Sequence, residues 1–400
     1  MTDGVVLAHD YATQRGGAER VALKIAEAFP GSPMYTTLYE PKDTFPEFAD
    51  LDLRPGRLNR FGVLRRRHRL ALPLLARAVN AQEVSGDLLV ASSSGWAHGY
   101  QGARHTIVYC HSPARWLYST DRYLGTHTHP GARGRLRRAA ARTTLNQLMS
   151  PLRDWDLRSA RRADVYLANS TVTQRAIAEV YGVEAEVLPP PPALVPGGEE
   201  RSVPGVEPGF LLCVARLMPY KNVDIIIEAV NALSGLQLVV VGKGPDRERL
   251  QTLAGPRVRF LGGVSDAELS WLYVNCSALV AASHEDYGLS PLEAGTFGRP
   301  SVVLRYGGFL DTVAEGQTGV FFDTPTAGAF SEAVREALRH PWSSQVITDT
   351  VDRFASHRFA QRLQEVAAQL GGAPVGTPPR RQPEPRNVAD PPAQDGTVVA

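Results

Sequence analysis

The feature that most constrains the fold is a unit of strand, loop and helix that occurs near the start of the chain and again in its second half. Near the start, an apolar run over Val5–Ala8 leads into a loop that ends in Gly16-Gly17, and a helical pattern then continues to Phe29. In the second half, the apolar run Phe210–Val214 is again followed by a helical pattern. Alternation of this kind predicts an α/β fold built on parallel sheets.

Strand-like runs continue both alternations. They cover Leu88–Ala91, Thr106–Cys110, Val165–Ala168 and Glu186–Leu188 in the first half, and Leu236–Val241, Val258–Leu261, Ala278–Ala281 and Ser301–Leu304 in the second. The expected architecture is therefore two Rossmann-like βαβ domains that face a central cleft. Ligands of such sheets bind outside the carboxyl ends of the strands.

Proline-rich stretches divide the chain into five expected segments. A first domain covers residues 1–195 and ends after four consecutive prolines, a linker covers 196–209, and a second domain covers 210–353. Residues 354–370 have the pattern of an amphipathic closing helix, and the low-apolar, proline-rich composition of 371–400 predicts a disordered tail.

Composition limits the class of protein. The three cysteines, Cys110, Cys213 and Cys276, are far apart and odd in number, which favours a reducing compartment and argues against a disulfide framework or a zinc site. The N-terminal residues MTDGVVLAHDY have neither the basic region nor the long apolar run of a secretory signal. Because no apolar run approaches the roughly 20 residues that span a bilayer, we expect a cytoplasmic protein.

Two carboxylates frame a glycine turn in the stretch HEDYGLSPLEAG. Glu285 comes directly after a strand-like run, and Glu293 falls early in the helix that follows. The amides of Gly288, Leu289 and Ser290 are then expected at that helix N-terminus, which favours anions. An anion cradle between two acids that accept hydroxyl groups suits a sugar phosphate. The alternative is structural: one acid caps a loop and the other complements the helix dipole.

Two cations and one histidine are expected at the same edges of the sheets. Arg216 follows the first strand of the second domain, and Lys221 comes five residues later, before the next helix. Charges of this kind can stabilise a leaving diphosphate, although either could be an ordinary surface side chain. His111 lies at the end of another strand, in the first domain. In the same domain, the Gly16-Gly17 loop opens a helix. Either feature alone is weak evidence for a binding site.

Taken together, these residues resemble the retaining glycosyltransferases of family 4, which have the GT-B architecture. The most specific element is the Glu-x7-Glu motif of Glu285 and Glu293, and the next is the Arg-x4-Lys pair of Arg216 and Lys221. The Gly-Gly-Ala-Glu loop and His111 also match. The similarity covers roughly residues 5 to 370, and it implies that the closing helix crosses back to the first domain.

The resemblance implies roles for the second domain. Arg216 and Lys221 would stabilise the departing nucleoside diphosphate. Glu285 would hold hydroxyls of the transferred sugar, and Glu293 would hold the ribose. The backbone amides of Gly288–Ser290 would complete the diphosphate cradle, so that neither a metal ion nor a cofactor is expected.

In the first domain, the resemblance implies that Gly16 and Gly17 approach the donor diphosphate and the sugar, and that His111 contacts the sugar near its anomeric centre. The strings CHSPARWLYSTDRYL (110–124) and RYGGFLDTV (305–313) are similar to bacterial GDP-mannose-dependent transferases. We therefore expect transfer of a hexose, with mannose favoured, to a lipid-linked or glycan acceptor in cell-surface polysaccharide or glycolipid synthesis.

Three other functions fit parts of the pattern. A nucleotide-sugar 2-epimerase on the same fold would need further acids and histidines in the cleft, and a non-catalytic sugar-nucleotide-binding protein would not need the full charged set. A dinucleotide-dependent oxidoreductase is disfavoured because no Gly-x-Gly-x-x-Gly follows the first strand.

The charge is unevenly distributed along the chain. The net charge is +2, but residues 1–195 carry +7 and the remainder −5. A basic cluster of Arg65, Arg66, Arg67 and Arg69 precedes the leucine-rich stretch up to Val79, and Pro73 divides this region into two short pieces. We expect this surface to contact anionic lipid on the inner face of the plasma membrane, and no nucleic acid; the alternative is a helix whose leucines pack on the sheet while the arginines are solvated.

Overall fold

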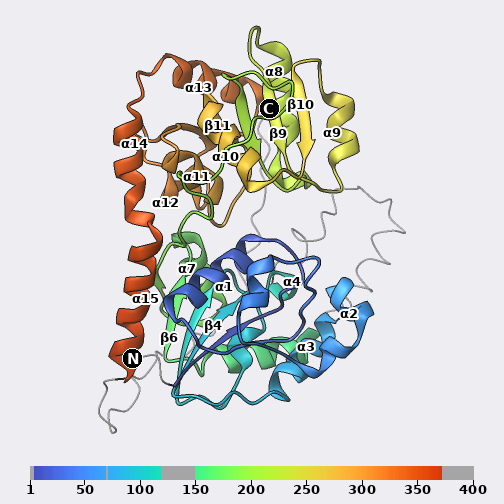
Figure 1. Ribbon diagram of the computed structural model, residues 1–400, viewed down its shortest axis with the longest axis vertical. Coiled ribbons are helices and arrows are strands. Elements are labelled where there is room, and N and C mark those ends of the chain that lie inside the picture. Colours follow the sequence, from blue (N-terminus) through green and yellow to red (C-terminus); the bar gives the residue numbers. More distant parts are fainter. Residues whose placement is uncertain (1–3, 69–70, 119–148, 372–400) are drawn as a thin grey trace, which may run out of the picture.

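The computed structural model describes residues 4–68, 71–118 and 149–371, which form two α/β domains stacked along the long axis of the molecule (Figure 1). Residues 119–124 of the motif at 110–124, Arg69 of the basic cluster and residues 372–400 of the expected tail lie outside the described residues. No helix within the described ranges is long and apolar enough to cross a membrane.

The first domain is built on a parallel sheet with the strand order β3-β2-β1-β4-β5-β6-β7. The strands are β1 (Val5–His9), β2 (Met34–Thr36), β3 (Leu53–Pro55), β4 (Leu88–Ser93), β5 (His105–Cys110), β6 (Val165–Ala168) and β7 (Glu186–Val187). The central strands are buried on both faces, which explains why they consist of nearly continuous apolar runs.

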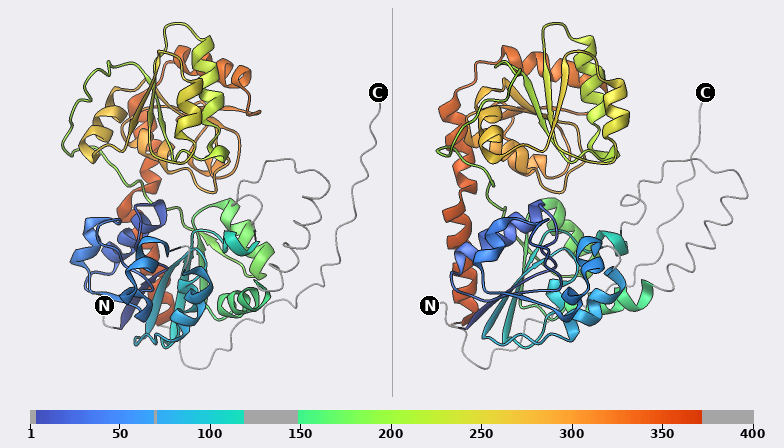
Figure 2. Two further views of the ribbon diagram at one scale, coloured as in Figure 1. Left: turned by 90° about the vertical axis from the view of Figure 1, so that its right-hand side faces the viewer. Right: turned by 45° about the vertical axis from the view of Figure 1, so that its right-hand side comes forward.

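Helices cover both faces of this sheet (Figure 2). They are α1 (Gly17–Ala28), α2 (Gly62–Arg66), α3 (Leu72–Asn80), α4 (Arg115–Tyr118) and α7 (Thr171–Tyr181), with short 3₁₀ helices η1 (Pro46–Asp50), η2 (Arg57–Arg60) and η4 (Ala97–Gly99). The limits of α7 follow from its sequence: Ser170 accepts a hydrogen bond from the Thr173 amide, and Gly182 ends the helix at φ 67°.

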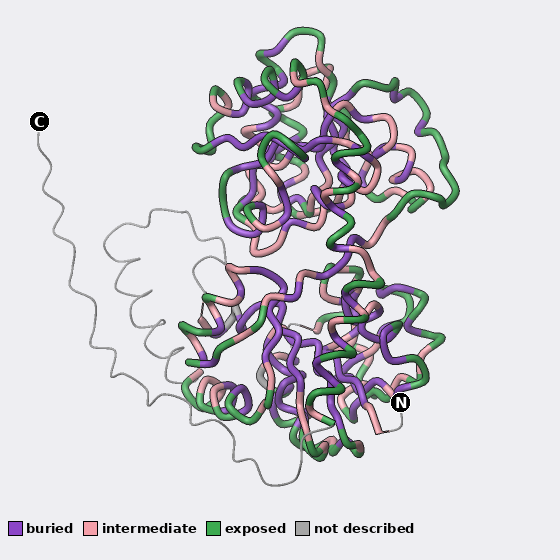
Figure 3. The backbone as a smooth tube through the Cα atoms, turned by 90° about the vertical axis from the view of Figure 1, so that its left-hand side faces the viewer, coloured by how far each residue is buried: buried purple, intermediate pink, exposed green. Residues whose placement is uncertain are grey.

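The second domain repeats the plan with the strand order β10-β9-β8-β11-β12-β13. Its strands are β8 (Leu211–Val214), β9 (Leu238–Val241), β10 (Val258–Gly262), β11 (Ala278–Ala281), β12 (Ser301–Leu304) and β13 (Gly319–Phe322). Its helices are α8 (Val223–Ala232), α9 (Arg247–Leu253), α10 (Asp266–Asn275), α11 (Leu289–Thr296), α12 (Phe309–Thr312), α13 (Ala327–Arg339) and α14 (Ser344–Val351), with 3₁₀ helices η5 (Pro219–Lys221) and η6 (Asp352–Phe354). The buried residues follow the sheet strands of both domains (Figure 3).

The last described helix, α15 (Ser356–Gly371), returns to the first domain, as the sequence predicted (Figure 1). Phe359 and Leu363 are buried in the same apolar cluster as Leu7 and Ile25. The Gln364 side chain also donates a hydrogen bond of 2.7 Å to the Ala28 carbonyl. Replacing a large buried side chain of this kind by alanine typically lowers the free energy of unfolding by about 2–5 kcal/mol. The helix therefore joins the two domains firmly.

Sequence patterns found most of the elements. The region around Pro73 does form two separate helices, α2 and α3, as expected. The strands β2, β3 and β13 were not predicted, although other strands of similar length, such as β7 and β11, were.

Candidate functional site

The carboxyl ends of the two sheets lie opposite each other, and several contacts join them. A Cβ atom on Gly17 would lie 3.3 Å from the Leu289 side chain, so the glycine loop at the start of α1 touches the start of α11. The Thr171 amide and hydroxyl both donate 2.8 Å hydrogen bonds to the carboxylate of Asp311. Two glycine-opened helix N-termini from different domains therefore meet at one place, where both favour negative charge.

Lys221 and Glu285 form an ion pair in the second domain. Both are largely buried, and the Ser283 hydroxyl donates a 2.9 Å hydrogen bond to the same Glu285 oxygen. Asn222 adopts a left-handed conformation at φ 51°, and its side chain donates to the Ala282 carbonyl, which fixes the turn that carries Lys221 beside β11. From the sequence, Lys221 was expected to contact the diphosphate and Glu285 the transferred sugar. In the structure the two side chains instead contact each other.

Arg216 is exposed just after β8, and its side chain has no hydrogen bond or ion pair with the described residues. It is therefore an exposed cation at the edge of the site, with no preformed contact among the described residues. The neighbouring loop depends on glycine: a Cβ atom on Gly244 would collide with the Leu217 carbonyl. Of the two cations that the sequence predicted here, Lys221 is thus paired and Arg216 has no partner among the described residues.

The turn around Gly288 is supported by a second glycine pair that sequence reasoning noted only as part of a motif. The Gly308 amide donates a 2.9 Å hydrogen bond to the Glu285 carbonyl. Cβ atoms on Gly307 or Gly308 would overlap the backbone from Glu285 to Tyr287. Because Gly307 also has φ 62°, this close approach requires glycine, and it holds Gly288 to Ser290 at the start of α11.

Glu293 lies one turn into α11 and is partly buried. The Tyr273 hydroxyl donates a 2.6 Å hydrogen bond to its Oε2 atom. Burial raises the pKa of Glu293, while Tyr273 and the backbone of Ala193 and Leu194 lower it in part. The carboxyl group is therefore held between α11 and the segment at Ala193 and Leu194 that precedes the linker, a position that sequence spacing could not indicate.

Glu19, which the sequence placed in the Gly-Gly-Ala-Glu loop without a role, is the least expected group of the first domain. It is 1% exposed, and its Oε2 atom has no hydrogen-bond partner among the described residues. Burial raises its pKa to about 7, an effect that hydrogen bonds from its own amide and from Gln14 partly offset. A Cβ atom on Gly16 would lie 2.5 Å from this oxygen, so a larger residue at position 16 would have to displace the Glu19 carboxylate.

His111 lies one residue beyond β5 and is 8% exposed. Its Nε2 atom lies 2.8 Å from the Ser92 hydroxyl, which in turn lies 3.0 Å from Nδ1 of His9. Asp10, the residue after His9, points to the face of the sheet opposite to His9. There its carboxylate accepts hydrogen bonds from the amides at 94, 96 and 97. His9, Asp10 and Ser92 were missed because single polar residues at strand ends leave no periodic signal.

The basic cluster is divided by its contacts. Arg65 donates to Glu40 at 3.1 Å and to the Asn59 carbonyl at 2.8 Å, so it points into the domain. Arg66 and Arg67 are exposed and have no partner among the described residues.

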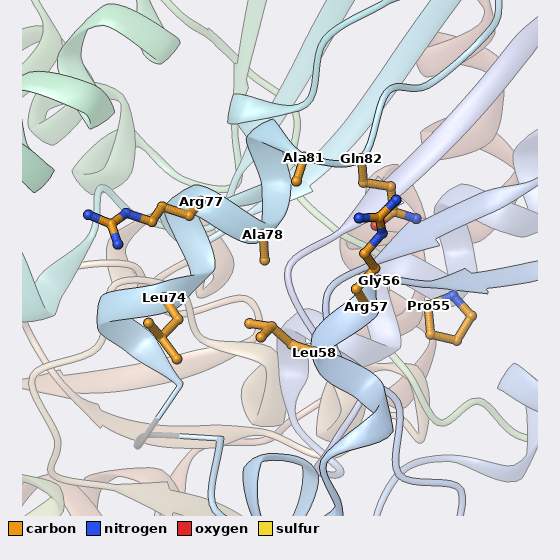
Figure 4. A pocket seen from close by; sticks show the side chains of 9 residues that line it. All are labelled: Pro55, Gly56, Arg57, Leu58, Leu74, Arg77, Ala78, Ala81 and Gln82. Carbon is orange, nitrogen blue, oxygen red and sulfur yellow. The ribbon is translucent and has the colours of Figure 1, made fainter.

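The leucine-rich helix packs largely as the alternative interpretation expected. Leu75 and Val79 of α3 are buried in the core, while Leu74 is 40% exposed. Leu74 lines a shallow groove of about 350 Å³ between η2 and α3, where Arg57 and Arg77 lie on either side of Leu58 and Ala78 (Figure 4). Phe61 and Val63 are also exposed, so this surface combines apolar and basic side chains.

No cluster of three or more His, Cys, Asp or Glu side chains in the described part of the chain could hold a metal ion. All three cysteines are buried and form no disulfide bond.

Comparisons with known proteins agree with this architecture. Residues 199–351 match the family described as Glycosyl transferases group 1. The α-1,3/1,6-mannosyltransferase of Dictyostelium discoideum is 32% identical over 120 residues, a match that spans 28% of each chain. The chain thus spans about a quarter of the length of that relative.

Other similarities extend over nearly the whole chain. The GDP-mannose-dependent α-(1-6)-phosphatidylinositol monomannoside mannosyltransferase of Mycolicibacterium smegmatis is 25% identical and is matched over 84% of this chain and 89% of its own length. The Anabaena protein HepE, solved with UDP-glucose, superposes with a TM-score of 0.65 at 19% identity, over 92% of this chain and 100% of that one. The second domain therefore matches the group 1 glycosyl transferases, and the chain as a whole has the GT-B fold and is similar to GDP-mannose-dependent mannosyltransferases.

Proposed function

We propose that the protein is a retaining glycosyltransferase of family 4, which moves a hexose from a nucleotide sugar to a lipid-linked or glycan acceptor in cell-surface polysaccharide or glycolipid synthesis. The observation that carries the proposal is the meeting of the N-termini of α1 and α11 across the domain boundary at Gly17 and Leu289. Each terminus presents amides and a positive dipole end, so a diphosphate fits between the domains.

The ion pair of Lys221 and Glu285 supplies the next step. When a diphosphate binds, the ammonium group is drawn towards the phosphate oxygens, and Glu285 is released to accept hydroxyl groups of the sugar. As the bond between the anomeric carbon and the diphosphate breaks, negative charge grows on the leaving group. Lys221, Arg216 and the helix N-termini stabilise that charge, which is where preorganised donors contribute most.

Mannose is the favoured sugar, and GDP the favoured nucleotide. The support is the name of the mycobacterial relative, which aligns over most of the chain. The structural neighbour with UDP-glucose has the same fold but a different donor, so the nucleobase has to be tested directly.

The basic and apolar surface around α2 supports an acceptor at a membrane. Arg66 and Arg67 are exposed beside Phe61 and Val63, and Arg65 is held by Glu40 and contributes little to this surface. Each exposed arginine near an anionic leaflet contributes about 1 kcal/mol to binding. This surface supports our proposal that the enzyme lies peripherally on the inner face of the plasma membrane.

The proposal is tested by thermal unfolding in the presence of GDP-mannose, UDP-glucose, dTDP-glucose and ADP-glucose. A donor at 100 times its dissociation constant stabilises the protein by about 2.7 kcal/mol, and we expect this with GDP-mannose. Lys221→Ala should lose the shift, whereas Arg335→Ala, which removes an exposed cation of α13, should keep it. No shift with any of the four donors would refute the proposal.

A further inference from the structure

Three side chains at the carboxyl ends of neighbouring strands, His9, Ser92 and His111, form a line of hydrogen bonds. The strands β1, β4 and β5 are adjacent, and His9 is in direct register with Ser92. The Ser92 hydroxyl lies 3.0 Å from Nδ1 of His9 and 2.8 Å from Nε2 of His111. The three residues are 2%, 1% and 8% exposed, so bulk water does not compete for these hydrogen bonds.

The number of protons in this line restricts the tautomers. A hydroxyl has one hydrogen and two lone pairs, so Ser92 can donate to only one of the two imidazoles. Its hydrogen has no other acceptor among the described residues, so it donates to one ring and accepts from the other. If it donated to His9, the remaining proton of neutral His9 would be on Nε2, which is buried without a partner among the described residues. In the reverse arrangement Nε2 of His9 is a buried acceptor without a donor, and a buried N–H group without an acceptor is the rarer of the two. The favoured arrangement therefore has His9 Nδ1–H donating to Ser92, and Ser92 donating to Nε2 of His111.

The environment keeps His9 neutral, as this arrangement requires. Burial lowers the pKa of His9, although Asp10 and the Ser92 backbone act in the opposite direction. Phe48 lies beside the ring, with a centroid separation of 6.3 Å. His9 is thus a fixed hydrogen-bond donor rather than a second charge near His111.

We propose that Ser92 and His9 are positioning residues that hold His111 as the neutral imidazole with its proton on Nδ1. This inference deepens the proposed function and rests on it, because it gives His111 a defined N–H donor for a hydroxyl of the transferred sugar. A donor that is already oriented needs no rearrangement as the sugar reacts. The contribution of His111 to the reaction then depends on the hydrogen bonds that orient its ring.

The tautomer is measured by ¹⁵N NMR of histidine-labelled full-length protein, with the His111 signals assigned from His111→Gln. In the wild-type protein, the account predicts a protonated Nδ1 and an unprotonated Nε2 that accepts a hydrogen bond. A proton on Nε2 would overturn the proposal without any variant. Ser92→Ala should produce a mixture of tautomers, and an unchanged His111 spectrum in that variant would also overturn it.

Ser93 provides a matched control. It is the next residue of β4, is also 1% exposed, and points to the opposite face, where its hydroxyl lies 2.9 Å from Nδ1 of His98. Ser93→Ala removes the same atom from the same strand and should leave the His111 tautomer as it is. A change in His111 of equal size in both variants would show a general disturbance of the strand and refute the specific role of Ser92.

Kinetics provide the second measurement. Ser92→Ala should lower kcat about 10-fold while changing the donor KM less than about 2-fold, because the lost hydrogen bond acts on the reacting sugar. Ser92→Thr keeps the hydroxyl and should restore most of kcat; a threonine variant as slow as the alanine variant would count against the proposal. If the wild-type protein transfers no sugar, the proposed function fails, while the NMR result still decides the tautomer.

Discussion

The buried carboxyl group of Glu19 makes the stability of the first domain depend on pH in a direction opposite to that of most acids. In the unfolded chain, Glu19 ionises near 4.5, whereas burial raises its pKa in the folded protein to about 7. Below pH 4.5 both states hold the proton. Between pH 4.5 and 7 the unfolded state loses its proton first, so the free energy of unfolding falls as the pH rises.

The magnitude follows from the two pKa values. The difference between a pKa of 4.5 and a pKa of about 7 corresponds to about 3 kcal/mol of the free energy of unfolding. The protein loses this contribution by pH 8. Glu19→Gln keeps the shape of the side chain and removes the ionisation, so it should stabilise the protein by about this amount at pH 8 and change little at pH 4.5. The gain arises because Oε2 is buried without a partner, so the charged form is poorly solvated.

The assay is urea unfolding of the wild-type and variant proteins at several pH values, followed by circular dichroism. Glu27→Gln is the control, because Glu27 is on the same helix but exposed and paired with Lys24. It should change the free energy of unfolding by less than about 1 kcal/mol at every pH. Parallel stability curves for the wild-type and Glu19→Gln proteins would refute the reasoning.

Three further predictions concern the donor, the domains and the membrane. Steady-state kinetics should show a lower kcat for Glu285→Gln and a higher donor KM for Glu293→Gln, and the reverse pattern would exchange their roles. Asp311→Asn removes the negative charge at the start of α7, so it should weaken the interaction between the domains by about 0.3–1 kcal/mol. X-ray scattering should then report a larger radius of gyration. An unchanged radius would argue against a role of Asp311 in holding the domains together. Replacing Arg66 and Arg67 by Ser should weaken sedimentation with anionic vesicles about 30-fold at low salt, and wild-type protein that stays in the supernatant would exclude this surface.

Patterns in the sequence were sufficient for the fold and for the edges where the site lies. Buried apolar strands such as β4 and β9 are visible as continuous runs, and the residues that follow them must lie at the carboxyl edge of a parallel sheet. For this reason Lys221 and Glu285, which follow the adjacent strands β8 and β11, could be assigned to one site from the sequence.

Side-chain partners could not be predicted, because they depend on distances across the fold. Thr171 and Asp311 are 140 positions apart, and nothing local to either residue indicates their hydrogen bonds. Likewise, Arg65 resembles its neighbours in sequence, but its reach to Glu40 removes it from the basic surface. The burial of Glu19 depends on how α1 packs, which no spacing of residues encodes.

The account is tested most directly by the product of a single reaction. The full chain is incubated with GDP-mannose labelled with ¹³C at the anomeric carbon and with a lipid-linked glycan acceptor, and the product is examined by ¹³C NMR. We predict release of GDP and a new glycosidic bond with the same anomeric configuration as the donor, both abolished in Lys221→Ala. Inversion at the anomeric carbon, or full activity in Lys221→Ala, would contradict the account.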